Sequence, residues 1–331
     1  MMRRKICMII GLFLCLGLSS QGVMAKQILR MGFGDPIDSD QGALAKRFKK
    51  VVEGLSGGEL DVQLFPNGAL GTETEMLQNV RRGTLDIAII GIGNMVPFVK
   101  DIGTLTMPYL LESHYDAIAA TTGELGKMWT DTTEKKGGFK IIAWTYSGFR
   151  NLTNSKRPVA KMDDLKGLKI RIPQNKIILE TLNSWGANAV PMAWTETFTA
   201  LQQKVVDGQD NPYIVNYTMK FHEVQDYLTE IHYQYSLQPV IVGVKKWKKL
   251  DEKTRTILTR AGIEAQQYNA AFQILEADKA KQKMIDAGMK FNVLEDEEQL
   301  KKIAIEQVWP KFYDFIGGKA NLDKVTKALG K

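Results

Sequence analysis

Cysteine and histidine are both scarce in this sequence. Its only two cysteines, Cys7 and Cys15, lie close to the N-terminus, so the rest of the chain can hold no disulfide bond, thiolate metal site or cysteine nucleophile. The three histidines, His114, His222 and His232, are isolated, and none has a partner at the spacing of a metal site or a catalytic triad. We therefore expect no metal, no cofactor and no enzyme activity.

Phosphate-binding and nucleophile motifs are missing as well. The chain has neither a glycine-rich loop ending in Gly-Lys-Ser/Thr nor a nucleophile elbow. Residues 91–94, Gly-Ile-Gly-Asn, lack the third glycine and the later acidic residue of a dinucleotide-binding fingerprint. They do follow a predicted strand, where ligands of open α/β sheets bind, so Asn94 is a candidate ligand contact. Glu73 and Glu75 lie two positions apart on a predicted helix and do not face each other, so no catalytic carboxylate pair is expected there.

The first 25 residues have the composition of a signal peptide. A basic segment at 3–5 precedes an apolar segment at 6–18 and a small-residue cleavage site at 23–25, which predicts a cut after Ala25. An uncleaved membrane anchor is the alternative, but the apolar segment is short for a membrane-spanning helix. The sequence therefore predicts a secreted protein.

Charge and length limit the classes that remain. Removing the signal peptide takes away three basic and no acidic residues, so the net charge falls from +7 to +4, with both signs interspersed. Such a chain has no nucleic-acid footprint, and no later segment is apolar enough to cross a membrane. The remaining 306 of 331 residues are long enough to form two lobes.

Alternating strand and helix patterns predict an α/β fold. Strand 28–33, helix 41–54 and strand 60–65 form a βαβ unit, and Asp35 in the turn after the first strand is a candidate ligand contact. The unit repeats with helix 72–82 and the apolar strand 85–90. Further predicted helices and strands lie at 115–136, 140–144, 187–192, 205–212, 230–234, 239–244 and 251–286. The apolar stripe of the last, long helix is expected to be core.

Residues 163–173 contain the first candidate for a charged ligand contact. After a polar turn closed by Gly167, Leu168, Ile170 and Ile172 alternate with Lys169 and Arg171, which predicts a short strand ended by a proline. The planar guanidinium of an arginine matches a carboxylate, so Arg171 is a candidate anion ligand. The alternative is an arginine on a solvated face or in a structural ion pair.

Two other polar residues lie at predicted strand ends, namely Arg150 and Asn211. Two arginines can clamp one carboxylate, each charge-assisted contact contributing about 1.5–3 kcal/mol. A guanidinium does not titrate near neutral pH, so such a clamp binds an anion without transferring a proton. The pattern favours capture and release of an anion over catalysis.

These motifs occur in an order that resembles a known family. The chain is similar to the DctP-type solute-binding subunits of tripartite ATP-independent periplasmic (TRAP) transporters, and the likeness covers nearly all of the mature chain. The motifs that carry it are Gly148-Phe149-Arg150, residues 164–173, Pro191-Met192-Ala193-Trp194, Ala200-Leu201-Gln202-Gln203 and residues 206–212, supported by residues 65–71 and 83–86.

The resemblance implies a two-lobed periplasmic binding protein fold, with crossing strands and a long lobe-spanning helix. Lobe I is expected to comprise 26–148 plus 238–276, and lobe II 149–237 plus 277–331. It also implies a periplasmic protein that closes over one small acid and delivers it to a TRAP membrane permease.

The resemblance assigns roles in the site. Arg171 is expected to make the main salt bridge to the carboxylate, Arg150 to assist, and Asn211 to hydrogen-bond the ligand. Trp194 stands where relatives often have phenylalanine, so it is expected to form an aromatic wall. Phe149 and Tyr213 are further candidate ligand contacts.

The ligand class is predicted from a difference between this sequence and the family pattern. Residues 91–94 occupy the loop where sialic-acid-binding relatives carry a glutamate, so a hydroxyl-rich acid is expected to lose partners there. The sequence is rich in nearby aromatic residues, which favours an acid with an aromatic or apolar body: Trp144, Tyr146, Phe149, Trp194, Tyr213 and Tyr217. Alternatives are a C4-dicarboxylate or sugar-acid ligand, a ligand sensor for a membrane kinase, and a periplasmic hydrolase or lyase.

Overall fold

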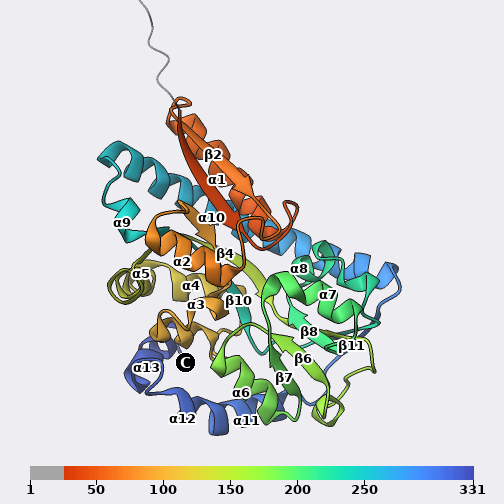
Figure 1. Ribbon diagram of the computed structural model, residues 1–331. Helices are drawn as coiled ribbons and strands as arrows, with labels where there is room; N and C mark the ends of the chain where they lie inside the picture. The colour runs from red at the N-terminus through yellow and green to blue at the C-terminus, as the bar shows by residue number, and fades with distance from the viewer. Residues whose placement is uncertain (1–25) are drawn as a thin grey trace, which may run out of the picture.

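The protein folds into two mixed β-sheets, each flanked by helices (Figure 1). The computed structural model describes residues 26–331, and the predicted signal peptide lies outside the described residues. The first sheet, in the order β2-β1-β3-β10-β4, consists of β1 (Gln27–Phe33), β2 (Leu60–Phe65), β3 (Ile87–Ile89), β4 (Phe139–Phe149) and β10 (Tyr235–Gly243). The second, in the order β11-β9-β5-β8-β6-β7, consists of β5 (Asn151–Asn154), β6 (Lys169–Ile172), β7 (Asn188–Pro191), β8 (Gly208–Asn211), β9 (Tyr227–Glu230) and β11 (Lys290–Val293).

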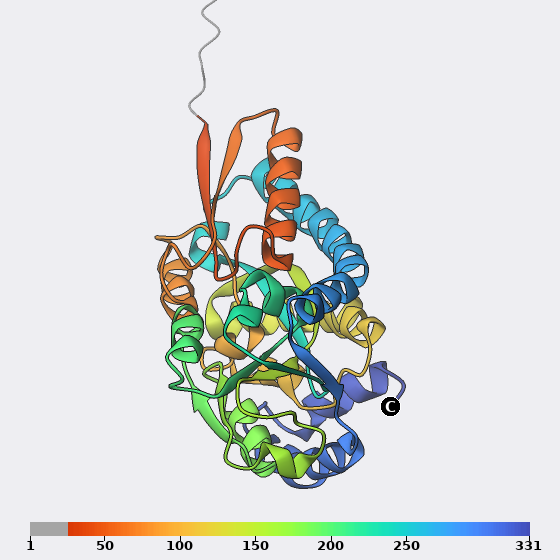
Figure 2. The same ribbon diagram turned by 90° about the vertical axis from the view of Figure 1, so that its right-hand side faces the viewer.

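Helices cover both faces of the first sheet. The helices around it are α1 (Asp40–Leu55), α2 (Glu73–Arg82), α3 (Ile92–Met95), α4 (His114–Thr121), α5 (Gly123–Gly137), α9 (Val244–Trp247) and the first half of α10 (Glu252–Asp286). On one face, Phe33 packs with Phe48 of α1 and Leu258 of α10, and Figure 2 shows these two helices side by side. On the other face, Met76 of α2 and Trp129 of α5 belong to a second apolar cluster. The predicted parallel βαβ start is confirmed, since β1 pairs in parallel with both β2 and β3.

The second sheet has its own core. The helices around it are α6 (Lys176–Ser184), α7 (Thr197–Gln202), α8 (Tyr213–Thr218), α11 (Glu297–Ile303) and α12 (Trp309–Phe312). Ile170 and Ile172 of β6 are fully buried against Trp185, whereas Lys169 is exposed. Arg171 alternates with the two isoleucines, as predicted, and its side chain therefore leaves this core on the opposite face of the strand.

Two nearly continuous pieces of chain cross between the sheets. β4 ends at Phe149 and β5 begins at Asn151, so Arg150 is the single residue between them. The return path runs from β9 through residues 231–234 into β10, and the Arg150 amide donates to the Gln234 carbonyl over 3.0 Å. The crossing strands expected from the family resemblance are confirmed, and they place Arg150 and Gln234 between the lobes.

Helix α10 is a third connection between the lobes. Its 35 residues begin after Asp251, whose side chain accepts from the Thr254 amide. The first half packs on the first sheet, and Met284 near the end packs on Leu228 of β9, so the predicted lobe-spanning helix is confirmed. Its apolar stripe is only partly core, however, because Leu275 is 65% exposed.

Polar side chains in the middle of α10 form hydrogen bonds with the edge strand of the first sheet. β4 is an edge strand, so part of its backbone lacks a strand partner. Side chains of α10 supply the missing acceptors for the backbone amides of β4. Gln266 accepts from the Trp144 amide over 2.9 Å, and Asn269 accepts from the Tyr146 amide over 2.7 Å. These hydrogen bonds account for the polar residues on the side of α10 that packs against β4.

The close approach of α10 to β4 depends on Gly262. A Cβ atom at this position would lie 2.1 Å from the Ile142 carbonyl oxygen. We expect Gly262→Ala to lower the free energy of unfolding by about 1–3 kcal/mol, because backbone overlap outweighs the better helix propensity of alanine. Gly54→Ala in α1, where a Cβ would meet nothing within 4 Å, is the matched control and should stabilise slightly. Equal effects in urea denaturation would contradict this account.

Three predicted boundaries are corrected by the structure. The single helix predicted at 115–136 is two helices, because the backbone at Thr122 is extended between α4 and α5. The strand predicted at 230–234 ends where it was expected to begin, since β9 is Tyr227–Glu230 and the following residues cross between lobes. In segment 205–212 the strand is β8, which begins only at Gly208.

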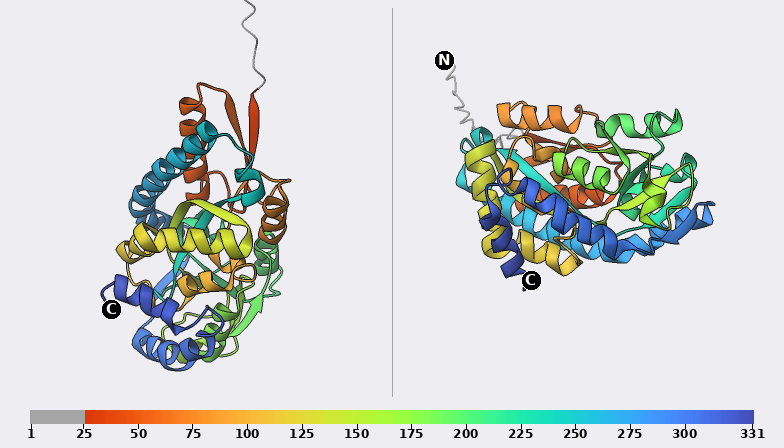
Figure 3. Two further views of the ribbon diagram at one scale, coloured as in Figure 1. Left: turned by 90° about the vertical axis from the view of Figure 1, so that its left-hand side faces the viewer. Right: turned by 90° about the horizontal axis from the view of Figure 1, so that it is seen from below.

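The C-terminal helix lies next to helices of the N-terminal half of the chain. Helix α13 (Lys319–Ala328) packs against α4, and Leu322 and Val325 belong to a core cluster of the first lobe (Figure 3). Within residues 277–331, α13 thus buries its apolar face against helices that flank the first sheet. The division into lobes stays a prediction. Within residues 26–331, none of the helices combines the length and the hydrophobicity that a membrane crossing requires.

Candidate functional site

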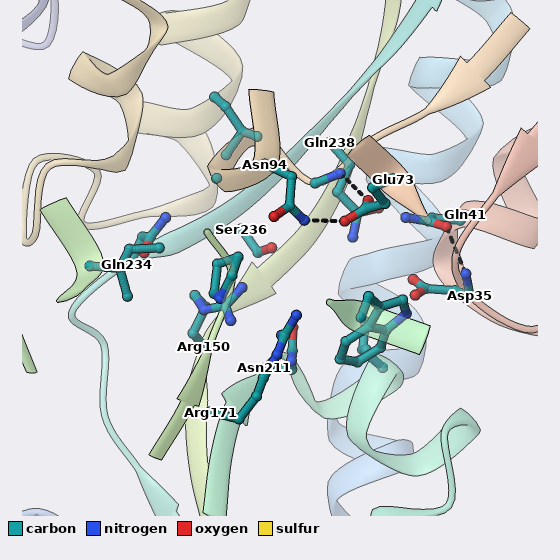
Figure 4. A pocket seen from close by; sticks show the side chains of 17 residues that line it. Asp35, Gln41, Glu73, Asn94, Arg150, Arg171, Asn211, Gln234, Ser236 and Gln238 are labelled. Atoms are coloured by element: carbon teal, nitrogen blue, oxygen red, sulfur yellow. Dashed lines mark hydrogen bonds between the residues drawn. The ribbon is translucent and has the colours of Figure 1, made fainter. Parts of the chain in front are cut away.

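A pocket lies between the two lobes, with a cavity volume of about 40 Å³ (Figure 4). It is lined from both sheets: the ends of β1 and β3 and the start of α2 contribute from the first lobe, and β6, β8 and the segment after β7 from the second. Six of the predicted site residues line it: Asp35, Asn94, Arg150, Arg171, Trp194 and Asn211. Phe149 and Tyr213 do not; both line a separate cavity of about 230 Å³.

Arg171 carries a buried positive charge in this pocket. It is 2% exposed, and its Nε and Nη2 atoms both donate to the Met192 carbonyl, over 3.2 and 2.8 Å. Its guanidinium carbon lies 5.2 Å from the centre of the Trp194 ring. Within residues 26–331 it forms no salt bridge, and burial, together with the charge of Arg150, lowers its pKa to about 10. A cation in this state favours an anion as its partner.

Arg150 is buried nearby but is already neutralised. Its Nε atom donates to Asp210 Oδ2 over 2.6 Å and its Nη2 atom to Oδ1 over 3.1 Å. The Tyr233 hydroxyl donates to the same carboxylate. Burial by itself would lower the pKa of Arg150, but the Asp210 carboxylate outweighs burial and raises it. The two arginines of the predicted clamp therefore differ: Arg150 is paired with a carboxylate, whereas Arg171 forms no salt bridge with any of residues 26–331.

Two carboxyl groups face the pocket from the first lobe. Glu73 accepts from the Gly91 amide over 2.6 Å and from the side-chain amide of Asn94. Asp35 is 2% exposed, and its Oδ2 atom has no hydrogen-bond partner among the described residues. Burial raises the pKa of both groups, and the charges of Asp40 and Glu73 raise that of Asp35 further. Figure 4 shows these carboxyl groups on the side of the pocket away from the two arginines.

Sequence reasoning missed Glu73, although its local signal was visible. The capping box of α2 uses Thr72 and Glu75, so Glu73 remains free to point elsewhere. It reaches the loop at 91–94, where the absence of a glutamate had favoured an aromatic ligand. A glutamate is thus present at this loop after all, supplied by a neighbouring helix 18 positions earlier in the chain.

Other polar residues of the pocket were also missed. Gln234, Ser236 and Gln238 lie on the second crossing segment, and Gln41 lies at the start of α1. Ser236 and Gln238 alternate with Leu237, which is fully buried in the core, so a period of two was available as a signal. Gln41 accepts from the Asp35 amide over 3.0 Å, and Asn211 donates to Gln209 over 2.6 Å.

Unpaired polar atoms gather in this pocket. Among the described residues, four buried atoms that line it have no hydrogen-bond partner: Asp35 Oδ2, Trp194 Nε1, Gln234 Oε1 and Gln238 Oε1. Of the six aromatic residues that favoured an aromatic or apolar ligand, Trp194 alone lines the pocket. Trp144 and Tyr146 belong to the lobe core, and Tyr217 stacks on His222. The pocket thus presents hydrogen-bonding groups rather than aromatic faces.

Known proteins are similar to this chain in sequence and in fold. The family described as bacterial extracellular solute-binding protein, family 7 (DctP) matches residues 35–314. The 2,3-diketo-L-gulonate-binding periplasmic protein YiaO of Escherichia coli (strain K12) is 32% identical over 271 residues, which cover 82% of this chain and 81% of that protein. The C4-dicarboxylate-binding periplasmic protein DctP of Rhodobacter capsulatus is 31% identical over 303 residues, covering 91% and 90%.

A solved structure gives the same result. The sugar acid binding protein DctPAm from Advenella mimigardefordensis, in complex with galactonate, superposes with a TM-score of 0.88 at 30% identity, covering 92% of this chain and 97% of that one. Both the matched length and the two-lobed α/β fold agree with the resemblance found in the sequence. The chain therefore belongs to the DctP family of bacterial extracellular solute-binding proteins, the TRAP-type substrate-binding subunits of transporters.

Proposed function

We propose that this protein captures a small hydroxylated carboxylate of the sugar-acid class in the periplasm and delivers it to the membrane permease of a TRAP transporter. The observation that carries the proposal is the buried guanidinium of Arg171, which has no salt bridge within residues 26–331. A ligand carboxylate supplies the counter-charge, and Asn211 lies close by to orient it. Export by the N-terminal signal peptide brings the protein to the compartment where the permease is reached.

The unpaired polar atoms of the pocket support the proposal that the ligand carries hydroxyl groups. An aromatic or apolar body would leave Asp35, Gln234 and Gln238 unsatisfied, at about 1–3 kcal/mol for each buried group. Hydroxyl groups both donate and accept, so they satisfy these atoms and the Trp194 indole together. The aromatic ligand expected from the sequence is therefore replaced by the sugar-acid alternative. Relatives that bind 2,3-diketo-L-gulonate and galactonate support the same class.

Capture requires the two lobes to move. The ligand carboxylate meets Arg171 of the second lobe, and the hydroxyl groups meet Asp35 and Glu73 of the first, so one ligand ties both lobes together. The cavity of about 40 Å³ holds only about three times the room needed for one water molecule. A sugar acid therefore enters while the lobes are apart and is enclosed when they close about the crossing strands.

The proposal predicts a large thermal shift with a sugar acid. D-galactonate at a hundredfold excess over its dissociation constant is expected to stabilise the mature protein by about 2.7 kcal/mol, which is several degrees in Tm. D-galactose, which lacks the carboxylate, and benzoate, which lacks the hydroxyl groups, are the matched controls and should give no shift. Stabilisation by benzoate or indole-3-acetate without any response to sugar acids would reject the proposed ligand class.

A further inference from the structure

We infer that the pocket selects against a second carboxylate: Asp35 and Glu73 form an acidic side opposite Arg171, so an aldonate binds and the aldarate of the same length is rejected. The inference rests on the proposed function and goes beyond it, because sugar acids with one and with two carboxylates both fit the sugar-acid class. It also separates this protein from the dicarboxylate alternative. Four steps support it.

The first step is a count of the charges that line the pocket. Arg150 and Arg171 are its only cationic lining residues within the described chain. The charge of Arg150 is taken up by Asp210, so Arg171 alone is left for the ligand. One ligand carboxylate neutralises it, and a second carboxylate would be buried without a cation. An unpaired buried charge is strongly destabilising.

The second step concerns the groups on the acidic side. Glu73 receives hydrogen bonds from the Gly91 amide and the Asn94 side chain, both of which stabilise its ionised form. Asp40 lies behind Asp35 and is fully buried, with its Oδ2 atom bound by the Ser147 hydroxyl. A second ligand carboxylate on this side would therefore meet two lining carboxyl groups, Asp35 and Glu73, with the carboxyl group of Asp40 behind them.

The third step concerns hydrogen-bond direction. The free atoms on the acidic side include two acceptors, Asp35 Oδ2 and Gln238 Oε1, and one donor, Trp194 Nε1. A terminal hydroxyl donates to one acceptor and accepts from the indole. A terminal carboxylate accepts only, so it competes for the indole and leaves both acceptors unsatisfied. Hydrogen bonding and charge thus favour the same ligand end.

The fourth step is pH. The groups that face Asp35 and Glu73 are Asp40 of α1, Arg171 of β6 and Arg150 between β4 and β5. Burial raises the pKa of Asp35, Asp40 and Glu73, that of Asp40 to about 6. Protonation of these carboxyl groups at low pH removes repulsion toward a second carboxylate. Aldarate affinity should therefore rise as pH falls from about 8 to 5.5, while aldonate affinity changes less.

The test is calorimetric titration with D-galactonate and galactarate, which differ only at the terminal carbon. At pH 7.5 galactonate is expected to bind at least about a hundredfold more tightly, equivalent to about 2.8 kcal/mol. Asp35→Asn should reduce the ratio of galactonate affinity to galactarate affinity at least tenfold. Asp38→Asn, in the same loop but exposed, removes the same charge and should leave the ratio unchanged.

Each outcome decides one of the two claims. Equal affinities in the wild type, or tighter galactarate binding, would overturn the inference while leaving sugar-acid capture intact. Binding of neither acid would overturn the proposed function itself. If Asp35→Asn fails to fold, Glu73→Gln and the pH series on the wild-type protein give the same readout. A selectivity ratio that is constant between pH 8 and 5.5 would also count against the acidic side as its cause.

Discussion

Arg171→Met is expected to weaken D-galactonate binding by at least about a hundredfold while leaving the empty protein as stable as the wild type, or more stable. The lost interaction is a charge-assisted contact worth about 1.5–3 kcal/mol per hydrogen bond, and every 1.4 kcal/mol is tenfold in affinity. The empty protein is not expected to lose stability, because Arg171 is 2% exposed and forms no salt bridge within residues 26–331. Removing an unpaired buried charge relieves its desolvation cost.

This expectation is checked by calorimetric titration for binding and by thermal unfolding for stability. Arg260→Met is the matched control, because Arg260 is exposed on α10 and the same substitution should change neither quantity. Arg171→Lys keeps the charge but not the planar fork, so it should bind more weakly than the wild type and better than Arg171→Met. Retained binding with a lower Tm would restore the alternative raised by the sequence, a structural arginine.

Asp210→Asn, unlike Arg171→Met, is expected to lower the free energy of unfolding by a large amount. Asp210 is 1% exposed and carries the ion pair with Arg150 and the hydrogen bond from Tyr233. Removing one partner of such a buried pair leaves an uncompensated charge, which costs about 3–5 kcal/mol. A loss of this size lowers Tm by roughly 10 °C in a protein of this length.

Urea and thermal denaturation measure this loss directly. The control is Asp163→Asn, since Asp163 pairs with Lys166 over 3.1 Å on the surface, where both side chains are mostly exposed. An exposed pair of this kind contributes about 0–1 kcal/mol, so the control should be close to the wild type. If Asp210→Asn were equally mild, Arg150 would not depend on Asp210, and the distinction between the two arginines would be lost.

Much of the fold was predictable because its signals are local. The helix predicted at 251–286 matches α10 to within one residue, since Asp251 caps it and no proline interrupts its 35 residues. The strand ending before Pro173 was predicted equally well from the alternation around Ile170. Both features depend on neighbours a few positions away in the chain, which a single sequence contains.

The site was predicted less completely, because it depends on distant contacts. The sequence presents Arg150 and Arg171 as two members of one clamp, yet Arg150 is paired with Asp210, 60 positions later. That contact follows from the antiparallel pairing of β5 with β8, which brings Leu152 opposite Asp210. Glu73 was compared only with its helix neighbour, whereas its partners lie in a loop that the sheet brings to it.

The sequence by itself determined the family, the α/β class and the short strand that carries Arg171, because periodicity, caps and ordered motifs lie along the chain, and the family resemblance implied the crossing strands. Only the tertiary structure decided which charges remain unpaired and which polar groups face the ligand. The physical reason is that the charge balance of a buried group depends on its neighbours in space. In this protein those neighbours come from both lobes, and they changed the predicted ligand from an aromatic acid to a hydroxylated one.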